Sequence, residues 1–123
     1  MTDLINFKYL NLKTQRRDGR FVATPVWFAD HGGAYYIRTY AGSGKVKRAS
    51  NFQTGFIAPC KSNGTLLGDW VPATIRIAND ETTNTFADEL LDKKYGWFKK
   101  LFELITRTNK SGYTTLVVYP TPV

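Results

Sequence analysis

Prolines inside strand-like runs constrain the fold of this chain more than any other feature. Six runs are rich in β-branched and aromatic residues and are separated by turn residues, a pattern typical of β-strands. Pro25, Pro59 and Pro72 each fall within one of these runs. Because proline has no N–H to donate to a sheet, each must lie at an edge, a bulge or a strand start. Three such interruptions favour a small, strongly bent barrel over a flat sheet. The predicted strands are residues 7–14, 20–29, 34–40, 54–61, 70–78 and 113–120.

Turns and helices complete the predicted organisation. Asp18-Gly19 and the segment "DHGG" at 30–33 predict tight turns, so we expect the first three strands to form an antiparallel meander. Residues 83–96 have a helical apolar face and end at Gly96, and residues 97–107 have a second apolar stripe. A short helix is predicted over 44–52. Without a linker or repeat, residues 1–123 are expected to form one mainly β domain.

Composition limits the compartment and the partners. The apolar fraction of 42% is typical of a folded protein, and no run approaches the about 20 apolar residues that span a bilayer. The N-terminus lacks the pattern of a signal peptide, and the single cysteine, Cys60, cannot form an internal disulfide. These features predict a cytoplasmic protein that does not bind membranes.

The net charge of +7 predicts an affinity for anions, although solvated surface lysines would give the same total. Nucleic acid, phosphorylated cofactors and acidic tails are the classes of partner that such a charge attracts. The positive charge falls into three clusters: Arg16, Arg17 and Arg20; Arg38, Lys45, Lys47 and Arg48; and Lys93, Lys94, Lys99 and Lys100.

The turn at Ser43, Gly44 and Lys45 is a candidate phosphate site. It is not a P-loop, because Thr39 and Val46 occupy the positions where that motif needs glycine and a hydroxyl residue. At the start of a short helix, however, Ser43 and Gly44 would point free N–H groups at an anion. Lys45 adds a charge, and Arg38 and Thr39 end the preceding strand. A capped helix with solvated basic residues explains the same pattern equally well.

Side chains that could perform chemistry unaided are not evident. His31 is expected to be a turn residue rather than a metal ligand, and Cys60 a buried apolar one. Asp88 and Glu89 are adjacent on a helix and face different directions, so they make a poor acid–base pair. We therefore predict no metal site and assign no catalytic residue. A bound cofactor would have to carry any reaction.

Four segments in order resemble the pyridoxamine 5′-phosphate oxidase-like split β-barrel superfamily, and most closely its probable coenzyme F420-dependent oxidoreductases. They are "DGRFVATPVWF" (18–28), "YYIRTYAGSGKVKRASNF" (35–52), "APCKSNGTLLG" (58–68) and "KYGWFKKLFEL" (94–104). The resemblance implies a homodimer of six-stranded antiparallel split barrels with flanking helices. It also implies flavin or deazaflavin sites at the dimer interface.

The resemblance also implies the residues that bind the cofactor. The strand containing Thr24, Pro25, Val26 and Trp27 would lie along the ring. From their aromatic character alone, Trp97 or Trp70 is expected to reach the ring from the partner subunit. The segment containing Arg38, Thr39, Ser43, Gly44, Lys45 and Val46 would wrap the phosphate. Gly44 stands where FMN-binding relatives often have arginine, and the choice between F420 and FMN stays open. An oligoglutamate tail of F420 would suit Arg16, Arg17, Arg20, Lys47 and Arg48.

The expected function is therefore a flavin- or deazaflavin-dependent oxidoreductase that transfers hydride between F420 or FMN and a small unsaturated substrate. A non-catalytic FMN- or F420-binding carrier is the main alternative. A nucleic-acid-binding β-barrel is a remote one, because a small basic barrel with exposed aromatic residues also suits single strands.

Overall fold

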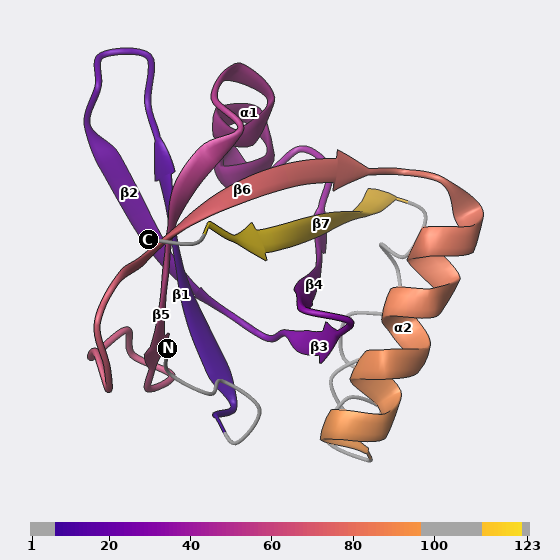
Figure 1. The fold of residues 1–123 in the computed structure, drawn as a ribbon. Coiled ribbons are helices and arrows are strands. Elements are labelled where there is room, and N and C mark those ends of the chain that lie inside the picture. Colours follow the sequence, from indigo (N-terminus) through magenta and orange to yellow (C-terminus); the bar gives the residue numbers. More distant parts are fainter. Residues whose placement is uncertain (1–6, 97–111, 122–123) are drawn as a thin grey trace.

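The computed structural model describes residues 7–96 and 112–121, in which one curled antiparallel sheet is flanked by two helices (Figure 1). Along the sheet the strands lie in the order β2-β1-β5-β6-β7-β4-β3. The elements are β1 (Tyr9–Gln15), β2 (Phe21–Val26), β3 (Ala29–His31), β4 (Ala34–Tyr40), α1 (Gly44–Asn51), β5 (Thr54–Cys60), β6 (Val71–Ala78), α2 (Glu81–Tyr95) and β7 (Tyr113–Pro120).

The described residues form seven strands rather than the six predicted, because the expected strand 20–29 is divided. It breaks at Trp27 and Phe28 into β2, which pairs with β1, and β3, which pairs with β4. Both predicted hairpins form, β1–β2 and β3–β4, but the predicted meander of three neighbouring strands is wrong, since the two hairpins lie at opposite ends of the sheet. Two residues carry the chain from one edge strand to the other. This short connection, spanning at most about 10 Å, brings the two edges together and curls the sheet into a split barrel.

The concave side of the sheet holds the main core. Leu10, Leu12, Ile37 and Ile75 are fully buried there, and α1 contributes Val46 and Ala49. Helix α2 covers the other face of β3, β4 and β7 (Figure 1). This arrangement buries both faces of β7, from Thr114 to Val118. The two helices therefore lie on opposite faces of the sheet.

Turn and proline positions agree with the sequence analysis. Gly32 and Gly33 form the two-residue β3–β4 turn with φ of +58° and +83°, the left-handed values of a type I′ hairpin. Pro25 lies on the edge strand β2. Pro59 lies beyond Ile57, where the pairing of β5 with β6 ends, and Pro72 is the second residue of β6.

Helix α2 has the predicted end and begins two residues earlier than predicted. The carboxylate of Asp80 accepts a hydrogen bond from the Thr83 N–H at 2.9 Å and caps the helix. Gly96, with φ of +57°, donates its N–H to the Asp92 carbonyl and ends it. The second predicted helix, 97–107, lies outside the described residues. In the described part of the chain, no helix is long and apolar enough to cross a membrane.

Candidate functional site

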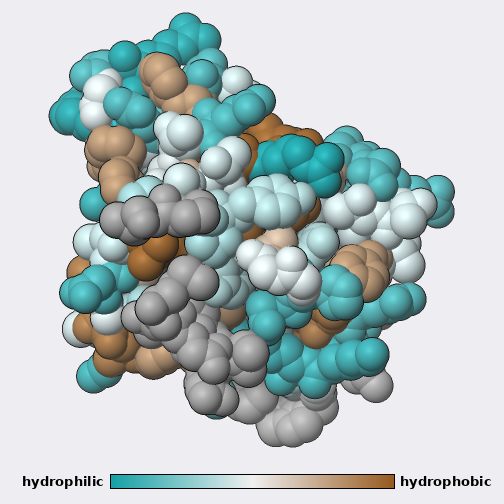
Figure 2. Space-filling view, in the orientation of Figure 1, coloured by the Kyte–Doolittle hydropathy of each residue, from teal (hydrophilic) through white to brown (hydrophobic). Residues whose placement is uncertain are grey.

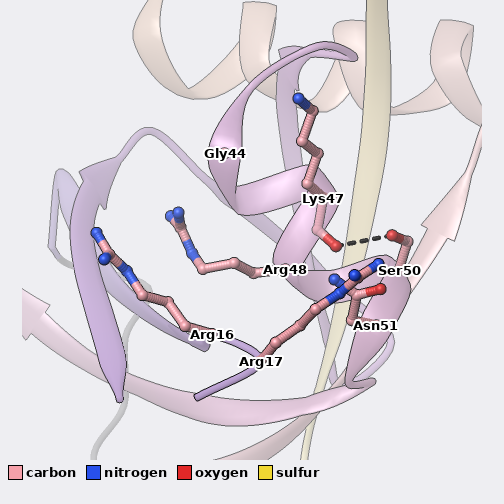
Figure 3. Close-up of a pocket in the computed structure, with 7 residues that line it drawn as sticks. All are labelled: Arg16, Arg17, Gly44, Lys47, Arg48, Ser50 and Asn51. Atoms are coloured by element: carbon pink, nitrogen blue, oxygen red, sulfur yellow. Dashed lines mark hydrogen bonds between the residues drawn. The ribbon is translucent and has the colours of Figure 1, made fainter. Parts of the chain in front are cut away.

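A basic groove separates the tip of the β1–β2 hairpin from helix α1 (Figure 3). It has a volume of about 420 Å³. In Figure 3 the side chains of Arg16 and Arg48 extend to the same side, whereas Arg17 extends toward Ser50 and Asn51. The hairpin tip around the groove is mainly hydrophilic (Figure 2). The residues that line the basic groove are Arg16, Arg17, Gly44, Lys47, Arg48, Ser50 and Asn51.

Local structure explains why these residues meet. Arg16 and Arg17 occupy the hairpin turn, which closes through a hydrogen bond from the Gly19 N–H to the Arg16 carbonyl at 3.0 Å. On α1, Gly44, Lys47 and Asn51 follow one another at spacings of three and four residues and so share one face. A Cβ atom on Gly44 would lie 2.7 Å from Nη1 of Arg48. The absence of a side chain at Gly44 therefore leaves room for the guanidinium.

The groove concentrates positive charge. Burial and, next, the charge of Arg16 lower the pKa of Arg48. Lys45 is half-buried beside the groove, and burial followed by the charge of Arg48 lowers its pKa. Among the described residues, the groove cations form no ion pair, since the nearby carboxylate of Asp18 binds Arg20 at 2.8 Å instead. An anion that entered would relieve this repulsion.

Hydroxyl groups accompany these cations. Arg48 Nε donates to Oγ1 of Thr14 at 2.6 Å, which fixes the guanidinium against β1. Ser43 stands at the N-cap position of α1, but its Oγ is buried and has no hydrogen-bond partner among the described residues. An unsatisfied buried hydroxyl is unfavourable, and a phosphate or carboxylate oxygen would satisfy it. Of the turn residues predicted to bind phosphate, Gly44 lines the groove, whereas Ser43 and Lys45 flank it in sequence and are not part of its lining.

Arg38 and Thr39 do not act together. Adjacent residues in a strand face opposite sides of the sheet, and here Arg38 faces α2. Its Nε binds Asp88 Oδ1 at 3.1 Å, and its Nη1 donates to Thr115 Oγ1 at 3.3 Å. Thr39 is buried, and Val46 is part of the core on the α1 side. Arg38 is thus separated from the groove and occupied by an ion pair.

The predicted ring-binding strand is an edge strand. Thr24, Pro25 and Val26 pair with β1 on one side only, because β2 ends the sheet order. The backbone N–H and C=O groups on its outer edge therefore have no ladder partner in the described chain. Pro25 contributes no N–H to this edge, because proline lacks one. Val26 also packs against the core. Such an edge can hydrogen-bond a polar ring edge.

Trp27 lies at the far end of β2, in a second pocket of about 450 Å³, here called the aromatic pocket. The Trp27 ring stacks on Tyr95 with centroids 4.6 Å apart and planes 10° apart. The Tyr95 hydroxyl accepts the Phe28 N–H at 3.0 Å and shares its proton between the carbonyls of Phe28 and Lys8, at 2.9 and 2.7 Å. The aromatic pocket is lined by Phe7, Lys8, Tyr9, Trp27, Ser62, Lys94 and Tyr95.

The remaining candidates have structural surroundings. His31 lies at the β3–β4 turn with its ring edge-to-face to Phe86 at 4.9 Å. Cys60 is free and buried, as predicted, and burial raises the pKa of its thiol. Asp88 is held by Arg38. No group of three or more potential metal ligands occurs within residues 7–96 and 112–121.

Sequence reasoning missed eight residues of the two pockets: Ser50 and Asn51 in the groove, and Phe7, Lys8, Tyr9, Ser62, Lys94 and Tyr95 in the aromatic pocket. Ser50 and Asn51 were predicted to be helical, and their spacing from Lys47 was a usable signal for a shared face. Lys94 was noted only as part of a charge cluster. Tyr95 bonds Phe28 across 67 positions, a contact for which the sequence contains no local signal.

Comparisons with solved structures agree with the expected fold. No protein-family model and no curated protein matches the sequence. A proposed pyridoxamine 5′-phosphate oxidase from Listeria innocua has a TM-score of 0.62 at 10% identity, over 94% of this chain and 85% of its own. An F420 reductase has 0.64 at 16%, over 97% and 91%. The heme storage protein HutZ from Vibrio cholerae has 0.64 at 13%, over 96% and 84%.

These likenesses define a class of fold. The curled antiparallel sheet with two helices has the same split-barrel fold as these structures, which confirms the fold expected from the sequence resemblance. The names of the similar structures include a reductase and a storage protein. The shared fold therefore does not distinguish an enzyme from a protein that only binds or stores a ligand.

Proposed function

We propose that this protein is a flavin- or deazaflavin-dependent oxidoreductase whose basic groove holds the anionic end of the cofactor. The main observation in support is the cluster of groove cations, which form no ion pair with any carboxylate of the described residues. The buried hydroxyl of Ser43, which precedes the groove residue Gly44 and has no hydrogen-bond partner in the described part of the chain, supports the same assignment. The fold of a similar F420 reductase agrees with it.

The edge strand β2 gives the cofactor a path. The groove and the aromatic pocket lie at opposite ends of β1, roughly 20 Å apart for a seven-residue strand, and β2 runs beside it. A ring placed along Thr24 to Trp27 would leave its chain directed toward Arg48 and Lys45. The bound ring would supply the hydride chemistry. The protein would hold the phosphate and orient the ring against the backbone.

The number of cations bears on the cofactor. A single phosphate needs fewer partners than Arg16, Arg17, Lys47 and Arg48 together provide. A coenzyme with several carboxylates, such as F420, uses more of them, although FMN remains the other candidate. In the superfamily that the sequence resembles, the sites lie between two subunits, so the proposal includes a homodimer, which analytical ultracentrifugation tests.

Cofactor titration tests the proposal. The purified protein is scanned for absorbance near the flavin maximum and then titrated with FMN and with F420. Lys45→Ala should weaken binding by about 1.5–3 kcal/mol, the scale of a charge-assisted hydrogen bond. Lys93→Ala, an exposed lysine on α2, is the matched control and should bind normally. If neither cofactor binds the parent protein, the proposal is wrong.

Turnover separates this proposal from its alternatives. Reduction of quinones or enones by the loaded protein supports an oxidoreductase. A tight complex without turnover supports a carrier, in keeping with the storage protein among the similar structures. Oligonucleotide binding that weakens steeply with salt would instead support the nucleic-acid alternative.

A further inference from the structure

The aromatic pocket has the character of a small-molecule site that the proposed cofactor groove does not require. Phe7, Tyr9, Trp27 and Tyr95 give it mainly apolar walls, and Ser62 adds a hydroxyl. Its volume of about 450 Å³ lies within the usual range for small ligands, about 300–1,000 Å³. The stacked pair of Trp27 and Tyr95 presents a flat surface suited to a planar ring.

Lys94 is a buried polar group of this pocket that lacks a hydrogen bond within the described chain. Its Nζ is buried and has no hydrogen-bond acceptor among the described residues. It lies 3.3 Å from the centroid of the Phe28 ring and 5.4 Å from that of Tyr95. An ammonium has three donors, and a ring face satisfies them only in part. A buried donor without an acceptor is unfavourable, so an acceptor that entered the pocket would be bound favourably.

The charges around Lys94 do not supply that acceptor. Asp30 on β3 is close enough to influence Lys94 electrostatically but forms no ion pair with it. Lys8, which also lines the pocket, adds positive charge. Burial is the main influence and lowers the pKa of Lys94 to about 8, so the amine is still mostly protonated at pH 7. The pocket therefore combines a cation with aromatic walls.

We propose that the aromatic pocket binds a small aromatic carboxylate, with its ring against the Trp27–Tyr95 pair and its anionic group paired with Lys94. The amine would turn from the Phe28 ring into the pocket, a movement that the flexible four-carbon stem of lysine allows. A carboxylate fits better than a neutral ring, because only an anion provides charge-assisted acceptors for the ammonium. This inference goes beyond the proposed function. The two proposals share Trp27, which ends the proposed path of the cofactor ring, but the aromatic carboxylate does not require a bound flavin.

Calorimetry with two matched probes tests the inference on the full chain without added cofactor. Benzoate and benzamide have nearly the same shape, but only benzoate is charged. At pH 7 benzoate should bind at least tenfold more tightly than benzamide. Equal affinities, or no binding of benzoate, would overturn the proposal. Because no flavin is present, this result is separate from the success or failure of the cofactor titration.

Two variants locate the effect at Lys94. Lys94→Met should reduce benzoate affinity at least tenfold, whereas Lys93→Met, at the exposed neighbouring position, should leave it unchanged. Benzoate affinity of the parent protein should also fall as pH rises from 7 to 9.5, because the amine loses its proton. A Lys94→Met protein that binds benzoate normally would overturn the proposal, as would a pH-independent affinity. Circular dichroism of both variants verifies folding, and the two-probe comparison needs no variant.

Discussion

The basic groove and the aromatic pocket both contain buried or half-buried cations. The charged group that most affects these cations is another cation in the groove and a carboxylate near the aromatic pocket. In the groove, burial and then a neighbouring cation lower the pKa values of Lys45 and Arg48. In the aromatic pocket, burial lowers the pKa of Lys94 while Asp30 opposes the shift. The groove is a cluster of cations that a bound anion would stabilise as a whole. The aromatic pocket is a mainly apolar site in which Lys94 is the buried amine, so its properties depend on single side chains.

Tyr95→Phe should show the largest difference in stability between the two regions. The substitution keeps the ring stack with Trp27 but leaves the Phe28 N–H and C=O without their partner. We expect the free energy of unfolding to fall by about 2 kcal/mol, measured by urea denaturation. Arg17→Ala in the groove, and Tyr119→Phe at an exposed site, should each change it by less than about 0.5 kcal/mol. A fall in the Arg17 variant as large as that in Tyr95→Phe would contradict the distinction between the regions.

The pH dependence of stability should give an intermediate effect. Because the folded state lowers the pKa of Lys94 to about 8, it binds fewer protons than the unfolded state between pH 8 and the ordinary pKa of 10.5. Stability contributed by this group therefore rises with pH in that window. After allowance for solvent screening, the parent protein should gain about 1 kcal/mol relative to Lys94→Met between pH 7 and 9.5.

The parent and the variant are compared by urea denaturation at each pH, so that titration of other groups cancels. Parallel stability curves would show that Lys94 keeps an ordinary pKa.

Asp88→Asn should have the smallest effect on stability, and it tests whether Arg38 lies outside the cofactor site. The substitution removes the ion pair with Arg38, whose partner carboxylate is 42% exposed, so the free energy of unfolding should fall by only about 0.5 kcal/mol. Affinity for FMN or F420, measured by fluorescence titration, should not change. A tenfold change in cofactor affinity would instead indicate that Arg38 contributes to the cofactor site.

Much of the fold was predictable because its signals are local. The strands Ala34–Tyr40 and Tyr113–Pro120 were located at their observed bounds from alternation and flanking turns. The break between β2 and β3 was missed, because Trp27 and Phe28 continue the apolar pattern without a turn residue. What divides that strand is pairing with two different partners, β1 and β4, at opposite ends of the sheet. Pairing partners are a property of the whole fold.

The candidate site was predictable in part for the same reason. The turn from Ser43 to Lys45 and the basic residues around it could be recognised from their sequence spacing. Arg38 was grouped with them although strand alternation places neighbours such as Arg38 and Thr39 on opposite faces. The Lys94–Phe28 contact joins a helix to a strand break far away in sequence, and no local pattern predicts it.

The position of β7 has a consequence for biosynthesis. This strand follows every other described strand in sequence, but it lies between β6 and β4 and joins the two halves of the sheet. Before residues 113–120 emerge from the ribosome, the β3–β4 hairpin can pack against α2 but has no strand that joins it to β6, and a two-stranded hairpin is at best marginally stable in water. The nascent chain therefore completes its barrel only after this segment is released, and until then it exposes strand edges that chaperones would have to shield.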